Sequence, residues 1–91
     1  MRKGWKIIID KKARLKIEKH GLTVHQVKRA LMGKVYIYKT YGRRYAVLGE
    51  DFGKIIKVII EPLKQLKKLR VITAYEPSQK DKKLYKRKVK K

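Results

Sequence analysis

Residues 35–61 read V-Y-I-Y-K-T-Y-G-R-R-Y-A-V-L-G-E-D-F-G-K-I-I-K-V-I-I-E, and this stretch decides the fold class. Apolar and aromatic side chains recur in it at every second position, which is the period of a β-strand. Glycines divide the pattern where turns are expected, so we predict three strands, at residues 35–41, 45–48 and 55–61. A hairpin loop at residues 49–53 joins the second strand to the third. The third strand is apolar on both faces, which predicts a central position, and Pro62 is expected to end it.

Helical patterns flank this stretch on both sides. Asp10 is suited to cap a helix over residues 11–20, and Thr23 forms a capping box with Gln26 for a helix over residues 24–32. Ser78 opens a last helix in the same way. Two further strands are expected, at residues 5–9 and 69–75. The result is an α+β fold: a four-stranded antiparallel sheet with two N-terminal helices, one C-terminal helix and a short extra N-terminal strand. We expect the helices on one face of the sheet, with the other face open to a partner.

The length of 91 residues is typical of one domain, and we expect a single domain over residues 1–91, with the basic tail 86–91 frayed. The sequence has no cysteine, which excludes disulfides and thiolate chemistry. Its longest apolar runs are far below the roughly 20 residues that a bilayer requires. We therefore expect a cytoplasmic protein without a membrane partner. Asn and Cys are absent while Lys and Ile are abundant, a composition typical of thermophiles.

The charge of the chain is strongly unbalanced. Lys and Arg number 28 against 7 Asp and Glu, giving a formal net charge of +21. A self-repulsion of this size favours a polyanionic partner: a nucleic acid, an acidic protein or an anionic membrane. Basic residues are interleaved with tyrosines on the predicted strands. We therefore expect a cationic, tyrosine-lined platform on the sheet, because cations bind phosphates and tyrosine rings stack on unpaired bases.

Metal and serine chemistry have little support. The seven acids do not cluster, and His20 and His25 are not spaced as a helical ligand pair. Ser78 is the only serine, and helix capping explains it. No metal site and no cofactor is therefore expected. RNA is a substrate that needs neither, because its own 2′-hydroxyl can attack the adjacent phosphorus. Basic and acid–base side chains then suffice for cleavage.

Three segments carry a resemblance to a known family. Lys12–Gly21 is similar to K-A-R-x-N-x-x-K-H-G, and Arg70–Tyr75 is similar to R-I-I-S-A-R. Ser78, Asp81 and Tyr85 match T-x-x-E-x-x-x-Y at the start of the last helix. The chain thereby resembles the BrnT family of toxin ribonucleases, within the RelE/ParE-like toxin superfamily. Tyr75 stands where the family has its second arginine, and a sister family with a Val-Thr-Ala-Tyr-like strand end is the alternative relative.

The resemblance implies a RelE-like fold and a metal-independent endoribonuclease. Its substrate would be RNA, including ribosome-associated mRNA, and a cognate acidic or ribbon-helix-helix antitoxin would hold it in check. The candidate catalytic residues are Arg70, Lys57, His20 and Tyr75. The candidate RNA-binding residues are Arg43, Arg44, Lys39, Tyr85, Lys82 and Lys83. The alternatives are a charge at a helix end for His20 and packing of the last helix for Tyr85. A non-catalytic nucleic-acid-binding module and a partner of an acidic protein stay open as whole-chain alternatives.

Overall fold

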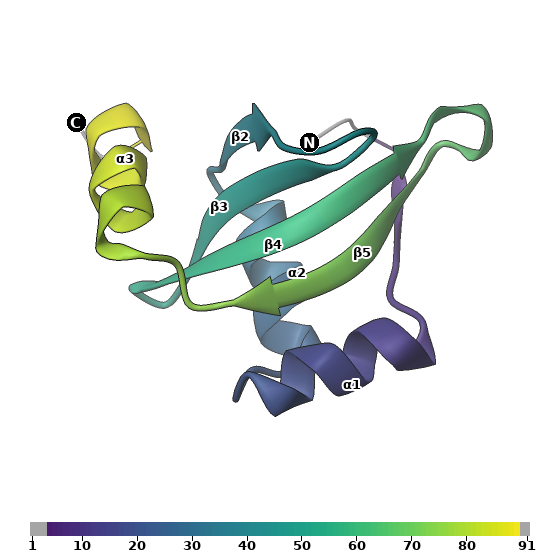
Figure 1. The fold of residues 1–91 in the computed structure, drawn as a ribbon, viewed down its shortest axis with the longest axis horizontal. Coiled ribbons are helices and arrows are strands. Elements are labelled where there is room, and N and C mark those ends of the chain that lie inside the picture. Colours follow the sequence, from purple (N-terminus) through teal and green to yellow (C-terminus); the bar gives the residue numbers. More distant parts are fainter. Residues whose placement is uncertain (1–3, 90–91) are drawn as a thin grey trace.

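The structure, a computed structural model, describes residues 4–89 (Figure 1). Three α-helices, five strands and one short 3₁₀ turn make up these residues. In chain order they are β1 (Lys6–Ile8), α1 (Lys11–Lys19), α2 (Val24–Met32), β2 (Tyr36–Lys39), β3 (Tyr45–Asp51), β4 (Lys54–Leu63), η1 (Lys64–Leu66), β5 (Lys68–Tyr75) and α3 (Gln79–Val89). The predicted helices and strands are therefore all present.

The five strands form one mixed sheet with the order β1-β5-β4-β3-β2. The strands β2 to β5 pair antiparallel, and β1 pairs parallel with β5. The predicted α+β class, with a four-stranded antiparallel sheet and an extra N-terminal strand, is confirmed. The strand β4 is central, as its two apolar faces predicted.

The capping residues define the helix boundaries as predicted. The Asp10 carboxylate accepts a hydrogen bond from the Ala13 amide at 2.8 Å, and so satisfies one of the unpaired donors at the start of α1. Thr23 and Gln26 form the complete capping box of α2, with reciprocal bonds of 3.2 and 2.9 Å. The α1 helix stops before Gly21, whose φ of +78° suits the chain reversal into α2.

The prediction that Pro62 ends the third strand is wrong, because β4 continues through it to Leu63. The register explains this extension. The last pair between β3 and β4 is Tyr45 with Ile60, so among residues 4–89 the strand has only β5 beside it beyond Ile60. Proline is tolerated on such an open edge, because no neighbouring strand needs its missing N–H group.

The main core lies between the sheet and the two N-terminal helices. Ile17 and Val27 are fully buried against the strand residues Val47, Ile56 and Val58. In Figure 1 α2 lies behind β3 and β4, and α1 lies below the sheet. The contact is closest at Gly49, where any Cβ would overlap the Ala30 backbone of α2. Glycine is therefore required here for close approach.

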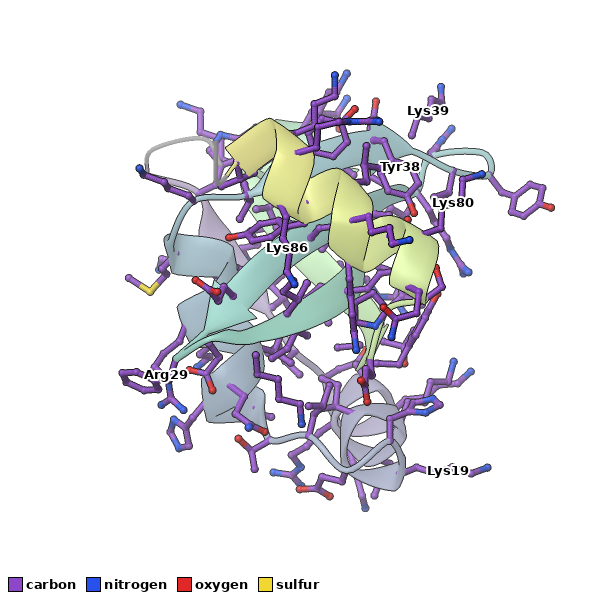
Figure 2. All side chains as sticks on the ribbon, turned by 90° about the vertical axis from the view of Figure 1, so that its left-hand side faces the viewer. Lys19, Arg29, Tyr38, Lys39, Lys80 and Lys86 are labelled. Carbon is purple, nitrogen blue, oxygen red and sulfur yellow. The ribbon has the colours of Figure 1, made fainter. Side chains whose placement is uncertain are left out.

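The expectation that all helices share one face is wrong, because α3 packs on the opposite face of the sheet. Tyr85 of α3 is 2% exposed and packs with Leu48 and Ile55, two apolar side chains that point away from the main core. Burying them requires a second layer. In Figure 1 α3 lies at the left beside β2 and β3, and in Figure 2 it crosses the front of the sheet.

The basic tail lies partly within α3. The helix runs to Val89, so residues 86–89 of the tail predicted to fray are helical, and residues 90–91 lie outside the described residues. Among residues 4–89 no helix is both long and apolar enough to cross a bilayer.

Candidate functional site

The most distinctive charged residue on the α3 face is Lys57 of β4. It lies between Ile55 and Ile59 on the strand and is 17% exposed. Its ammonium nitrogen Nζ donates a hydrogen bond to Oδ2 of Asp81 at 2.9 Å. Asp81 stands in the first turn of α3, where its own amide donates to Oγ of Ser78 at 3.2 Å. The predicted cap of the last helix thus also brings a carboxylate to Lys57.

Two tyrosine rings flank the Lys57 ammonium. Its nitrogen is 5.5 Å from the ring centre of Tyr38 and 5.7 Å from that of Tyr75, both within cation–π range. The Tyr38 hydroxyl donates to the Asp81 carboxylate, at 3.2 and 3.3 Å from its two oxygens. Strands β2 and β5 lie on opposite sides of the central strand β4, and each contributes one tyrosine ring beside the Lys57 ammonium.

The C-terminal end of α1 adds a fifth residue. The exposed side chain of His20, the C-cap of α1, has its ring 5.7 Å from the ring of Tyr75. We call these residues the Lys57 cluster: His20, Tyr38, Lys57, Tyr75 and Asp81. The cluster combines a fixed cation, two phenols, a carboxylate and an accessible imidazole.

The state of Lys57 follows from its neighbours. Burial lowers the pKa of its ammonium group, but hydrogen bonds with Tyr38 and Asp81 outweigh burial and leave the pKa above its ordinary value. Lys57 therefore remains positively charged at every physiological pH. It can stabilise negative charge, but it cannot serve as a general base.

Arg70 lies away from the cluster. It precedes Tyr75 by five residues on β5, roughly 16 Å along a strand. Its guanidinium is 3.6 Å from the Asp10 carboxylate that caps α1. Of the four predicted catalytic residues, the fold brings together Lys57, His20 and Tyr75 but not Arg70.

The predicted RNA-binding residues occupy two other regions. Lys39 and Arg43 line a hollow at the far end of β4, and Arg44 is exposed in the adjoining turn. On α3, Lys82 pairs with Glu76 at 2.6 Å and Lys83 is exposed. The remaining predicted residue, Tyr85, is buried, and its hydroxyl donates to the Lys34 carbonyl at 3.0 Å, so its ring packs α3 and is closed to a base.

Sequence reasoning did not assign Tyr38 or Asp81 to the site. The alternation of β2 could place Tyr38 on the same face as Tyr36, but nothing in the pattern brought α3 across that face. The sequence analysis did not single out Thr73 either. Two residues before Tyr75 on β5, its buried hydroxyl oxygen has no hydrogen-bond partner within residues 4–89.

A resident metal has no obvious ligands in this arrangement. Within residues 4–89 no three His, Asp or Glu side chains gather in a way that could hold an ion. Asp81 is the only carboxylate of the Lys57 cluster, and it is engaged by a lysine and a tyrosine.

No family model matches the sequence, and no curated protein sequence matches it either. A solved structure does match. The crystal structure of the Brucella abortus ribonuclease toxin BrnT superposes with a TM-score of 0.65 and 33% sequence identity. The match covers 82% of this chain and 99% of that one. The chain belongs to the BrnT family.

Membership of the BrnT family gives the three similar segments a structural meaning. The first is α1 with its C-cap, the second is β5, and the third opens α3. Each contributes one residue to the Lys57 cluster: His20 from the first, Tyr75 from the second and Asp81 from the third. Segments far apart in the chain thus meet at one site, and Tyr75 stands there in place of the arginine of the family pattern.

Proposed function

We propose that the chain is a metal-independent endoribonuclease, the toxin of a type II toxin–antitoxin pair. Two observations support this. The protein that it resembles at 33% identity is a ribonuclease toxin. The observation that carries the chemistry is the half-buried Lys57 cation, held between two tyrosine rings with a histidine alongside.

In the proposed reaction the RNA supplies its own nucleophile. The 2′-oxygen bonds to the adjacent phosphorus, the bond from phosphorus to the 5′-oxygen breaks, and a 2′,3′-cyclic phosphate and a 5′-hydroxyl result. The 2′-hydroxyl proton must leave and the 5′-oxygen must gain a proton. His20 is suited to one of these transfers, because an imidazole nitrogen can accept or donate a proton.

Lys57 would stabilise the charge that grows on the phosphoryl oxygens. A preorganised donor of this kind contributes about 3–4 kcal/mol in other enzymes. Tyr75 would donate a hydrogen bond to the same group. The Asp81 carboxylate orients the ammonium in the free protein, and the phosphate would take over part of that interaction. Arg70 would contact the RNA chain at a distance from the cut.

The test is cleavage of a single-stranded RNA in EDTA, with the ends analysed for 2′,3′-cyclic phosphate. We expect Lys57→Ala to lower the rate by about a hundredfold or more, as for loss of one charge-stabilising donor. Lys86→Ala removes an exposed lysine of α3 and is the matched control, with a rate near that of the wild type. Intact RNA after incubation with folded protein, or activity that EDTA abolishes, would refute the proposal.

A second candidate is a non-catalytic RNA-binding module on the same scaffold. Tyr75 favours it, since a phenol cannot neutralise phosphate as a guanidinium does. The Asp81 carboxylate favours it too, because it already compensates the charge of Lys57. This alternative predicts salt-dependent binding and no cleavage under any condition.

The proposed partners are RNA and a cognate antitoxin, either an acidic or a ribbon-helix-helix protein. A net charge of +21 attracts both polyanionic RNA and an acidic protein. Co-purification with the product of the neighbouring reading frame after nuclease treatment would distinguish a protein partner from RNA bridging. Loss of the complex on nuclease treatment would count against the antitoxin.

A further inference from the structure

A hollow of about 530 Å³ opens at the end of the sheet where β2 turns into β3 and β4 turns into β5. A volume of this size is within the range of small-ligand sites. The side chains relevant to binding there are Lys39, Arg43, Tyr45, Glu61, Lys64 and Leu66. Its nearest lining residue on β4, Glu61, is four residues from Lys57, roughly 13 Å along the strand, so the hollow is separate from the Lys57 cluster.

The backbone forms the hollow through a difference in strand length. The strand β3 begins at Tyr45, opposite Ile60, so the last three residues of β4 have no strand on that side within the described part of the chain. The turn from β2 to β3 closes one wall. It is held by the Thr40 amide donating to the Arg44 carbonyl at 3.0 Å and the Arg44 amide donating to the Tyr41 carbonyl at 2.9 Å. The opposite wall is η1, which ends at Lys67 in the left-handed conformation, φ +52°. The hollow is thus built by backbone hydrogen bonds before any ligand arrives.

The charges around the hollow are mixed and uncompensated. Lys39, Arg43 and Lys64 bring three exposed cations, and Glu61 brings one half-buried carboxylate. Within residues 4–89 none of the four takes part in an ion pair, although the protein forms such pairs elsewhere. Glu61 lines the same hollow as these three cations and forms an ion pair with none of them, so its carboxylate is available to a ligand that carries both a negative group and a hydrogen-bond donor.

A nucleotide of single-stranded RNA has this chemistry. Its phosphate is the anion, and the amino group of a base is the donor that a glutamate accepts from, as in Glu contacts with cytosine N4. Tyr45 in the lining, and Tyr41 on the adjoining turn with 90% of its surface exposed, offer ring faces for stacking. An acidic peptide fits less well, because it would meet the Glu61 carboxylate.

We propose that this hollow is a second RNA subsite, which binds one nucleotide with an amino-bearing base, its phosphate on Arg43 and Lys39 and its amino group on Glu61. The inference rests on RNA being the ligand of this protein, as proposed above, but not on cleavage. The subsite would add a preference for cytosine over uracil, because cytosine carries an amino group, which Glu61 can accept from, where uracil carries an oxygen. The Lys57 cluster does not supply this preference.

The test compares two labelled oligonucleotides of equal length, 2′-O-methyl oligocytidine and 2′-O-methyl oligouridine, by fluorescence anisotropy. The methyl group removes the attacking hydroxyl, so binding is measured without cleavage. We expect the wild type to bind oligocytidine several-fold more tightly. Glu61→Gln should remove this preference, because an amide both donates and accepts. Arg43→Ala should weaken the binding of both oligonucleotides much more than Lys86→Ala does. Lys86→Ala is the control, because it also removes one exposed positive charge, but on α3.

Three results would overturn the inference. The first is equal affinity of the wild type for the two oligonucleotides. The second is an Arg43→Ala variant that binds as well as Lys86→Ala does. The third is loss of the cytosine preference in Lys57→Ala, which would assign the preference to the cluster. Retained preference in a protein that cuts no RNA would instead refute the proposed cleavage and leave the subsite intact.

Discussion

Asp51, at the end of β3, is buried with only 6% of its surface exposed, and Arg29 of α2 makes this possible. The guanidinium donates from Nε to one carboxylate oxygen at 2.5 Å and from Nη2 to the other at 3.3 Å. It also lies 5.2 Å from the ring centre of Phe52 at the hairpin tip. The hydrogen bond from Arg29 holds the pKa of the Asp51 carboxyl below its ordinary value. At the scale of single residues, this pair attaches α2 to the turn between β3 and β4.

The Asp51 pKa predicts an acid-dependent loss of stability. A carboxyl whose pKa is lower in the folded than in the unfolded chain stabilises the fold above the unfolded pKa, about 3.9, and loses that contribution as pH falls through the folded pKa. The melting temperature of the wild type should therefore drop more steeply below pH 4 than that of Asp51→Asn. Glu18→Gln, which removes an exposed acid of α1, should follow the wild type. Parallel curves for Asp51→Asn and the wild type would contradict this.

At the scale of elements, α3 determines what the outer face of the sheet can do. Its sequence is mostly charged, and Tyr85 is its only fully buried side chain among the described residues. The Tyr85 hydroxyl reaches the Lys34 carbonyl just before β2, and the first turn of the helix carries Asp81 to Lys57. One helix therefore covers the second core and completes the Lys57 cluster.

Removal of the Tyr85 hydroxyl tests how α3 is held. Tyr85→Phe keeps the ring and leaves the Lys34 carbonyl without this donor, so we expect the free energy of unfolding to fall by about 0.5–1.5 kcal/mol. Tyr41→Phe removes a hydroxyl from a ring that is 90% exposed and should have no measurable effect. Urea denaturation of the three proteins measures the difference. Equal midpoints for Tyr85→Phe and Tyr41→Phe would show that the bond does not hold α3.

At the scale of the whole molecule, the basic side chains are not confined to one face of the sheet. Figure 2 shows side-chain nitrogens all around the outline of the protein in this view, and α3 covers part of the face expected to be open. The expectation of one cationic platform is therefore wrong. The net charge of +21 supplies a general attraction for polyanions, and the particular contacts are those proposed for the Lys57 cluster and the hollow.

This distribution predicts steep salt dependence of RNA binding. Each phosphate contact on a single strand contributes a slope of about −0.7 in a plot of log affinity against log salt. We expect a slope of several units for the wild type and a slope shallower by about 0.7 for Lys57→Ala. Anisotropy titrations over a series of potassium chloride concentrations measure both, with circular dichroism as the check on folding. Affinity that does not change with salt would argue against phosphate binding.

The local pattern accounts for nearly all of the helices and strands. Capping at Asp10 and Thr23, the period of two after Gly33 and the apolar faces of β4 act over a few residues, so they can be identified in the sequence directly. The resemblance of three segments to the BrnT family likewise points to His20 and Tyr75 as candidate site residues. The error at Pro62 was not local, since the tolerance for proline there depends on where the neighbouring strand β3 begins.

The meeting of distant side chains could not be derived in this way. Arg70 and Tyr75 belong to one short motif, yet they lie near opposite ends of the same strand, β5. Only Tyr75 therefore lies close to Lys57. Asp81 reads as an ordinary first-turn acid until α3 is laid across the sheet. That placement depends on which face still has apolar surface to bury after α1 and α2 have packed. Burial is a property of the assembled chain, and so the site it creates is visible only in three dimensions.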